Sequence, residues 1–421
     1  MRLWFIPMIY VAASVVCGLT LPRLEQAYFP LRTLNLSLAS AQAYLSAVAS
    51  GMMALTGVVF AMAFVMVQFS AIAYSPRLVL WFARDRVLFH SLGAFAATFM
   101  YALFTLAWID RGGSGTVPLI SALLVAVLLI VSMLLFAILV QRLIDLQVTN
   151  VLQLIGNKGR QAIADTFRRL DERPADEWKA GTDGGSGLGP VTQTVTYSGP
   201  PRTIARLNVG ALVRQARESD AVIEMVAAVG DTLAEGSVIL RVYGAKRSLV
   251  DKKLMRAVRL GTERTFEQDP KYPIRLLVDI AIRALSPAIN DPTTAVQAID
   301  QIEDLLRRLC RHDLDTGFVR DAGGALRLVV PMPSWEDYLA LAFDEIRQFG
   351  MASVQVMRRL RAALTGLADS ATMPARAETV RRYLKHLDRA IERSPLDAED
   401  KTIASQEDPQ GLGLSRRRLE K

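Results

Sequence analysis

Residues 44–74 read YLSAVASGMMALTGVVFAMAFVMVQFSAIAY, and they lie within a run from 33 to 76 that holds no charged side chain. A helix over these residues would be roughly 46 Å long at 1.5 Å per residue. The hydrocarbon core of a bilayer is about 30 Å thick. The stretch therefore predicts a transmembrane helix that is long enough to span with tilt or to project beyond one face.

One face of this predicted helix carries side chains at alternating steps of three and four residues that are all small or polar except Phe64. This set, named the seam, consists of Ala47, Ser50, Ala54, Gly57, Ala61, Phe64, Gln68, Ala71 and Ser75. Small residues let helix backbones approach closely in lipid, so tight helix packing is one interpretation. The other is a seam that lines a polar pathway, with Gln68 and Ser75 as its polar points.

Three further apolar runs, at about 3–21, 89–108 and 118–140, complete a predicted four-helix transmembrane region within residues 1–141. A cleaved signal peptide is not favoured for the first run, because no Ala-x-Ala site is seen and more spans follow. Basic residues near the spans are divided seven to three between the two sides of the membrane. The larger group lies on the side of the amino terminus, which predicts that both termini are cytoplasmic.

Arg77, Arg84 and Arg86 follow Ser75-Pro76, where the long helix is expected to end. At the inner interface they would contact anionic lipid headgroups, or they would form the cationic vestibule of an anion pathway. The whole chain has a net charge of +8, which divides into +4 for residues 1–141 and +4 for the rest. Such a weak, mixed excess argues against a nucleic-acid domain and fits attraction to the surface of the lipid bilayer.

The remaining sequence predicts a soluble part, so that the chain as a whole is an α+β membrane protein. The hairpin from Val229 to Gly236 resembles half of a lipoyl- or biotinyl-type barrel-sandwich domain, but no carrier lysine sits at its tip. The alternative is an ordinary hairpin with glycine turns. The predicted parts are an amphipathic connecting helix at 142–170, a linker at 171–190, a small cytoplasmic β barrel-sandwich-like domain at 191–246, an α-helical C-terminal domain at 247–394 and a disordered tail at 395–421.

A short polar elbow is predicted between two helices of the C-terminal domain. Asp291 followed by Pro292 is a strong helix start, with the aspartate as N-cap. The candidate residues of the elbow are Ser286, Asn290, Asp291, Thr293 and Thr294. They would either form a purely structural connection or hold a ligand or partner at the helix-start amides.

No enzyme motif is found in the sequence, and no catalytic, cofactor-binding or metal-binding residue is predicted. The chain has two cysteines, Cys17 and Cys310, which cannot build a disulfide framework or a zinc site. Its three histidines are scattered, so they are expected to be surface or capping residues.

Several stretches together resemble a known family. They are Val58-Val-Phe60, Gln68-Phe-Ser70, Ser75-Pro-Arg-Leu78, Arg84-Asp-Arg86, Arg264-Thr-Phe-Glu-Gln-Asp-Pro270 and Arg283-Ala-Leu-Ser-Pro-Ala-Ile-Asn-Asp-Pro-Thr-Thr-Ala295. The chain is similar, from the first span to about Leu367, to the bacterial predicted membrane proteins of domain-of-unknown-function family DUF2254. This resemblance implies an integral membrane protein of the bacterial inner membrane. It brings no established activity and no catalytic residues.

Two functions follow from these patterns as hypotheses. In the first, a homo-oligomer passes ions or small solutes along the seams and is gated by the cytoplasmic domains, because one four-helix unit offers little room for a pore. In the second, the spans anchor a cytoplasmic sensor or scaffold, and the soluble part binds a ligand or partner. An enzyme acting on lipids is the least supported of the classes considered.

Overall fold

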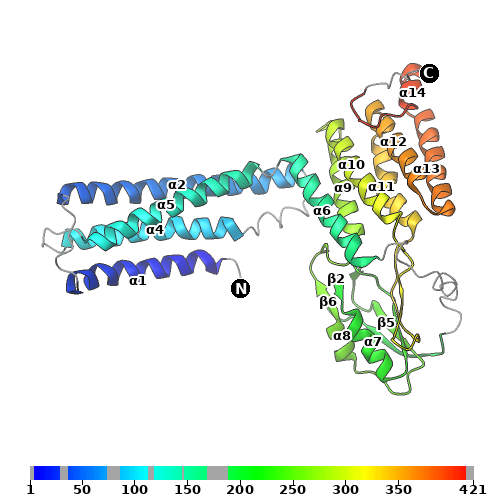
Figure 1. The fold of residues 1–421 in the computed structure, drawn as a ribbon, viewed down its shortest axis with the longest axis horizontal. Coiled ribbons are helices and arrows are strands. Elements are labelled where there is room, and N and C mark those ends of the chain that lie inside the picture. The colour runs from blue at the N-terminus through cyan, green and yellow to red at the C-terminus, as the bar shows by residue number, and fades with distance from the viewer. Residues whose placement is uncertain are drawn as a thin grey trace. The chain divides into compact units, whose positions relative to one another are not determined.

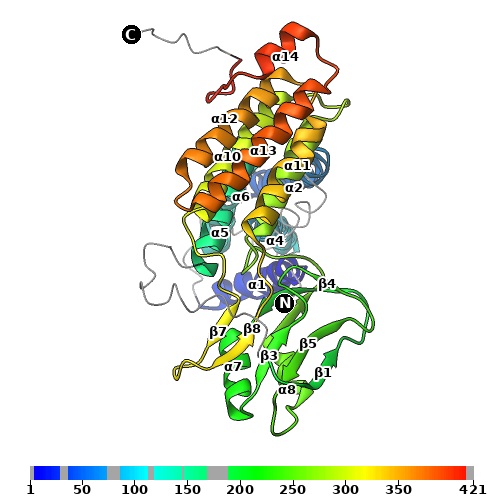
Figure 2. The same cartoon turned by 90° about the vertical axis from the view of Figure 1, so that its right-hand side faces the viewer.

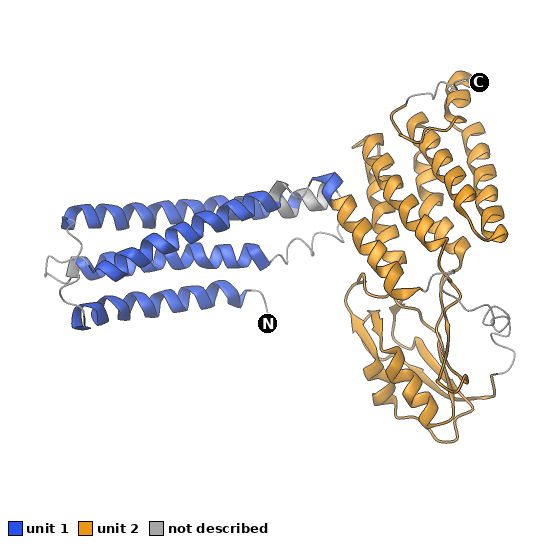
Figure 3. Ribbon diagram, in the orientation of Figure 1, with its two compact units in different colours: residues 1–150 blue, residues 151–421 orange. Residues whose placement is uncertain are grey.

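The computed structural model describes residues 4–28, 37–73, 86–111, 118–144, 147–167 and 188–413 (Figure 1, Figure 2). The chain divides into two compact units, residues 1–150 and residues 151–421 (Figure 3). Each unit has its own buried core, and each is described separately below.

The described part of unit 1 contains four helices that are long and apolar enough to cross a membrane, which confirms the predicted four-helix region. They are α1 (Phe5–Tyr28), α2 (Leu38–Ala73), α4 (Arg86–Arg111) and α5 (Leu119–Ile144). Helix α1 continues past its predicted end at residue 21, because Glu25 belongs to the helix and not to a loop. Its carboxylate accepts hydrogen bonds from the backbone N–H groups of Ile120 (2.6 Å) and Ser121 (3.1 Å) at the start of α5.

Helix α4 is the centre of unit 1, since it packs against α1, α2 and α5. Half of its most apolar stretch is buried, against 17–22% for the other three helices. Helices α1 and α4 approach closely at Gly18, where an added Cβ would lie 2.7 Å from the Cβ of Phe104. Small residues therefore do bring helices together in this unit, but those at the α1–α4 contact do not belong to the seam.

The β-region of unit 2 consists of two sheets. One has the strand order β1-β5-β3-β8-β7, in which β3 and β8 are parallel, and the other has the antiparallel order β4-β2-β6. The strands are β1 (Val191–Thr196), β2 (Arg202–Leu207), β3 (Val222–Met225), β4 (Thr232–Leu233), β5 (Val238–Tyr243), β6 (Val258–Gly261), β7 (Phe318–Arg320) and β8 (Leu326–Val329). Two short helices, α7 (Val209–Glu218) and α8 (Asp251–Ala257), accompany them.

The β-region does not end at residue 246, as the prediction had it. Strand β6 pairs with β2, and β8 joins the larger sheet beside β3, so both sheets use strands from later in the chain. Period-two patterning identifies single strands, but it does not reveal a partner that arrives some 80 residues later. The shared core includes Ile204, Ile223, Leu240, Val242 and Leu328.

The helical part of unit 2 is a bundle, clear in Figure 2. Its helices are α9 (Lys271–Ala284), α10 (Pro292–Leu309), α11 (Trp335–Phe349), α12 (Val354–Ser370), α13 (Pro374–Glu392) and α14 (Ala398–Ala404). Helix α6 (Val148–Thr166) joins this bundle, because Gly159 lies so close to Leu305 and Pro273 that a Cβ would be 2.7 Å from the Leu305 side chain. The connecting helix of the prediction is thus part of unit 2 from Val151 onward.

The prediction of a disordered tail from residue 395 was wrong as far as Gly413. Asp397 caps α14 by accepting a hydrogen bond from the backbone N–H of Asp400 (2.8 Å). Farther on, the buried carboxylate of Asp408 accepts from the N–H groups of Gly411 (3.0 Å) and Gly413 (2.6 Å). Arg358 of α12 donates to the carbonyl of Gly413 (3.0 Å), so polar side chains order a segment that has few apolar ones.

Candidate functional site

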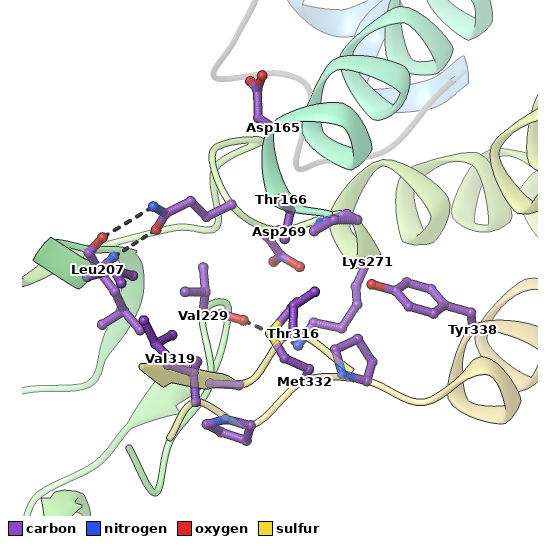
Figure 4. A pocket seen from close by; sticks show the side chains of 17 residues that line it. Asp165, Thr166, Leu207, Val229, Asp269, Lys271, Thr316, Val319, Met332 and Tyr338 are labelled. Carbon is purple, nitrogen blue, oxygen red and sulfur yellow. Dashed lines mark hydrogen bonds between the residues drawn. The ribbon is translucent and has the colours of Figure 1, made fainter. Parts of the chain in front are cut away.

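Unit 2 contains a half-open cavity of about 260 Å³ where its sheets meet its helical bundle (Figure 4). Segments far apart in the sequence line it: the end of α6, the turn at 228–229, the stretch 268–271, the strands and loop around 316–333, and the start of α11. The apolar part of the wall is made by Leu207, Val209, Val229, Val319, Val330 and Met332. Polar groups enter from α6, from the start of α9 and from α11.

Asp269 is the most unusual group in the cavity. Its side chain is 1% exposed, and neither carboxylate oxygen accepts a hydrogen bond from the described residues. The guanidinium of Arg264 lies 4.0 Å from Oδ2, at the limit of an ion pair. Burial raises the pKa of this carboxyl, although the charges of Lys271 and Arg264 and the nearby amides of Lys271 and Tyr272 oppose the rise.

Tyr338 and Thr166 add two more buried polar atoms. The Tyr338 side chain is fully buried in α11, and its hydroxyl has no hydrogen-bond partner within the described ranges. Burial raises the pKa of this phenol, and the nearby charge of Asp269 raises it further. The hydroxyl of Thr166, at the end of α6, is likewise buried without a partner among these residues. Buried polar groups in folded proteins are almost always hydrogen-bonded, so such a cluster requires an explanation.

Lys271 gives the cavity a positive group opposite Asp269. It is the first residue of α9, and its ammonium donates to the carbonyl of Val229 (3.2 Å). A lysine ammonium has three N–H donors, so this one bond leaves two for another acceptor. Figure 4 shows the carboxylate of Asp269, the ammonium of Lys271 and the hydroxyl of Tyr338 around one space, while the carboxylate of Asp165 points away from it.

The backbone around Asp269 is held in place by its neighbour Gln268. This residue has a left-handed φ of +56°, which is uncommon for a residue other than glycine. Its side-chain amide accepts from the N–H of Leu207 (2.9 Å) and donates to the carbonyl of Leu207 (3.2 Å). The side chain thereby fixes the loop to the end of β2, and the residue that follows turns its carboxylate into the cavity.

Gly230 makes room for Asp269 on the other side. Its φ is +91°, and a Cβ added there would lie 2.4 Å from Oδ2 of Asp269. The hairpin that resembles half of a barrel-sandwich domain therefore places a glycine against the buried aspartate. Asp231 stabilises the same turn by accepting a hydrogen bond from the N–H of Ala228 (2.9 Å).

The predicted seam lies on α2 and does not pack against the other described helices of unit 1. Ser50, Ala54, Gly57, Ala61 and Gln68 are all exposed, and no described atom lies within 4 Å of a Cβ built on Gly57. Ser75 falls outside the described residues, as do Arg77 and Arg84. Arg86 is the exposed first residue of α4.

The predicted elbow is a compact turn that satisfies its own polar groups. Asp291 caps α10, accepting hydrogen bonds from the N–H (3.1 Å) and the hydroxyl (2.5 Å) of Thr294. The N–H of Asn290, whose φ is +48°, donates to the carbonyl of Ser286 (2.8 Å). Thr293 is exposed at the first turn of α10, and none of the five elbow residues lines the cavity.

Sequence reasoning missed the cavity, although it had singled out the stretch from Arg264 to Pro270 for its resemblance to a family. A signal was available in Asp269-Pro270, an acidic residue directly before a helix. Nothing in the sequence says that Tyr338 and Thr166 approach the same point. Among the described residues no three His, Cys, Asp or Glu side chains gather as they would at a metal site.

Comparisons with known proteins agree with the membrane-spanning part of this structure. The profile of a family described as "Predicted membrane protein (DUF2254)" matches residues 1–366. The uncharacterized proteins Rv1290c of Mycobacterium tuberculosis and Mb1321c of Mycobacterium bovis are each 27% identical over 380 residues, which cover 86% of this chain and 70% of theirs. No solved structure matches. With four apolar helices of spanning length and a match over most of its length, the chain belongs to the DUF2254 family of predicted membrane proteins.

Proposed function

We propose that this protein is a membrane-anchored sensor whose soluble unit binds a small polar molecule in the cavity around Asp269. The observation that carries the proposal is the group of buried polar atoms without partners in the described chain: both carboxylate oxygens of Asp269 and the hydroxyls of Tyr338 and Thr166. Each such atom costs about 1–3 kcal/mol when left unpaired. A bound ligand that supplies the missing hydrogen bonds would remove this cost.

The cavity is connected to the membrane part through helix α6. Asp165 and Thr166 at its carboxyl end line the cavity, and its first residue, Val148, follows the last spanning helix, α5, by only a few residues. A ligand that binds Thr166 therefore acts on a helix that continues the chain from the membrane. Binding that favours one position of α6 shifts its equilibrium by the difference in affinity between the two positions.

The rest of the proposal follows from the sequence. The protein is placed in a bacterial inner membrane with both termini in the cytoplasm, and its partners are the bilayer and anionic lipid headgroups near Arg77, Arg84 and Arg86. The proposed activity is ligand binding, without a catalytic step, a cofactor or a nucleic acid.

Thermal unfolding of the full chain in detergent tests the proposal. The protein is heated with a panel of amino acids, amines, carboxylates, sugars and nucleotides. At least one class should raise the midpoint, since a ligand at one hundred times its Kd stabilises by about 2.7 kcal/mol. The Asp269→Asn variant should lose the rise, whereas Asp397→Asn, which changes an exposed helix cap outside the cavity, should keep it. No rise with any class, or a rise that persists in Asp269→Asn, would show that the proposal is wrong.

A second function, an ion or small-solute pathway in a homo-oligomer, is favoured by the exposed seam. Ser50, Ala54, Gly57 and Ala61 of the seam are exposed in the described part of unit 1, although small residues elsewhere in the unit, such as Gly18 of α1, do mediate close packing. In the proposed oligomer the seams of several copies face one another, and Gln68 provides a polar point along them.

Ion flux into liposomes that contain the purified protein tests this second function. Flux should exceed that of empty vesicles and should change by severalfold in Gly57→Leu and Gln68→Leu. Val16→Leu is the matched control, because Val16 is 60% exposed on α1 and lies outside the seam. Flux equal to that of empty vesicles would rule the pathway out, and flux unchanged in both seam variants would remove the seam from it.

A further inference from the structure

Three charged residues line the cavity around Asp269, and of these Asp269 and Lys271 point into it while the Asp165 carboxylate points away. One inward group of each charge restricts what the cavity can bind. The carboxylate of Asp269 is a hydrogen-bond acceptor without a donor among the described residues, so a ligand must bring N–H or O–H groups to it. A cationic nitrogen is the best donor, because hydrogen bonds between ionised groups are about twice as strong as neutral ones. Arg264 is too far away, at 4.0 Å, to fill this role with a short hydrogen bond.

Lys271 sets the opposite requirement on the same ligand. Its ammonium uses one donor on the carbonyl of Val229 and has two others to offer. The hydroxyl of Tyr338 is a further donor that has no acceptor within the described chain. An anionic oxygen placed between the two would accept from both, and a carboxylate has two oxygens that are suited to this.

The size and the walls of the cavity restrict the ligand further. Its volume of about 260 Å³ lies below the range of about 300–1,000 Å³ that is usual for drug-sized ligands. At about 30 Å³ per water molecule it has room for roughly nine waters, and thus for a ligand of a similar number of non-hydrogen atoms. Val229, Val319, Val330 and Met332 give it an apolar wall that would bury an aliphatic group.

We propose that the ligand is a free amino acid with an aliphatic side chain, whose ammonium group binds Asp269 and whose carboxylate binds Lys271 and Tyr338. This inference rests on the proposed sensor function and names the class of molecule that is sensed. The aliphatic side chain packs against the valines and Met332. Thr166 accepts from the ammonium group or donates to the carboxylate, and in this way it reports the bound state to α6.

Calorimetric titration of the full chain in detergent with matched compounds tests the inference. The probes are L-valine, L-leucine, L-isoleucine and L-methionine. Two analogues of leucine keep its carbon chain but carry one charge each: 3-methylbutylamine lacks the carboxylate, and 4-methylpentanoate lacks the ammonium group. At least one amino acid should bind, and for leucine as the ligand each analogue should bind at least tenfold more weakly.

Variants assign each charge to its residue. Asp269→Asn should weaken binding of the amino acid at least tenfold and should reduce its advantage over 4-methylpentanoate. Lys271→Met should also weaken binding of the amino acid at least tenfold, and it should reduce the advantage of the amino acid over 3-methylbutylamine. Asp397→Asn, at the exposed cap of α14 outside the cavity, should bind like the unchanged protein. Because variants of buried residues can fail to fold, circular dichroism of each one is compared with that of the unchanged chain, and the two analogues test the inference on the unchanged protein alone.

The outcomes separate this inference from the function on which it rests. If no amino acid binds, but another compound binds and depends on Asp269, the sensor function holds and the amino-acid inference is wrong. If the single-charge analogues bind as tightly as leucine, the inference is also wrong. If no compound of any class binds, the sensor function itself fails.

Discussion

Two aspartates in unit 2 occur in the same local sequence and end in opposite situations. Asp291-Pro292 and Asp269-Pro270 each stand at the start of a helix, α10 and α9 respectively. Asp291 is the N-cap of α10, and its carboxylate accepts two hydrogen bonds from Thr294. At α9 the N-cap is Pro270, so Asp269 lies one residue earlier, and its carboxylate accepts no hydrogen bond from the described residues. A single residue of helix register thus separates a carboxylate that caps a helix from one that accepts no hydrogen bond from the described residues.

Among the substitutions that test this contrast, Gly230→Ala should have the largest effect on the free energy of unfolding. The added Cβ would lie 2.4 Å from Oδ2 of Asp269, and the alanine would have to keep a backbone φ of +91°. We expect a loss of about 3 kcal/mol in the free energy of unfolding. Gly236→Ala is the control, since it has a φ of +80° but no described atom within 4 Å, and it should lose about 1 kcal/mol. Urea unfolding of the full chain in detergent measures both, and equal losses would show that Asp269 does not press against this turn.

Asp291→Ala should destabilise the protein by about 1–2 kcal/mol, because it removes the cap of α10 and leaves the Thr294 amide without its acceptor. Asp291→Asn should cost much less, since asparagine is an equally good N-cap. The same urea titration measures both variants. A similar loss in both would mean that the charge matters more than the hydrogen bond.

Asp269→Asn should stabilise the protein, whereas Asp291→Ala destabilises it. Burial raises the pKa of Asp269 in the folded protein, so the folded state binds a proton more tightly than the unfolded chain does. The stability contributed by the protonated form is then greatest below the unfolded pKa of about 3.9 and is lost as pH rises through the folded pKa. Without ligand at pH 7, Asp269→Asn should therefore be more stable than the unchanged protein by about 1 kcal/mol.

The pH profile of that difference provides the check. Thermal midpoints of the two proteins should converge as pH falls below the unfolded pKa of about 3.9, where the carboxyl is protonated in both the folded and the unfolded state. Lys271, Arg264 and Tyr338 face the same carboxylate. A variant that is less stable at pH 7 would indicate that Asp269 is paired in the native state.

Tyr338→Phe should give the smallest effect, a gain of about 0.5–1 kcal/mol, because it removes a buried hydroxyl without a partner among the described residues. Tyr197→Phe is the matched control. Its hydroxyl donates to the carbonyl of Pro200 (2.6 Å), so its removal should lose a similar amount. Thermal unfolding without ligand compares the two variants, and a loss in both would show that the Tyr338 hydroxyl already has a partner in the apo protein.

The sequence was sufficient for what depends on local pattern. The uncharged run around Gly57 predicted a spanning helix, and Asp291-Pro292 predicted a capped helix start, because both signals lie within one element. The cavity depends on contacts between distant segments: Gln268 binds Leu207, Gly230 faces Asp269, and Tyr338 arrives from α11. No local pattern distinguishes Asp269 from Asp291, since each precedes a proline near a helix start. The difference is that α10 begins at its proline, Pro292, whereas α9 begins at Lys271, one residue after Pro270.

The ordered segment that ends at Gly413 affects how the protein can be shortened. The family match stops at residue 366, inside α12 (Val354–Ser370), yet α13 and α14 pack beyond it and Gln355 and Arg358 hold the carbonyls of Gly411 and Gly413. A chain cut at the family boundary would expose to water the faces of α11 and α12 on which α13 packs. Expression of unit 2 by itself therefore needs an end point at or after residue 413, and a fluorescent reporter belongs beyond that residue.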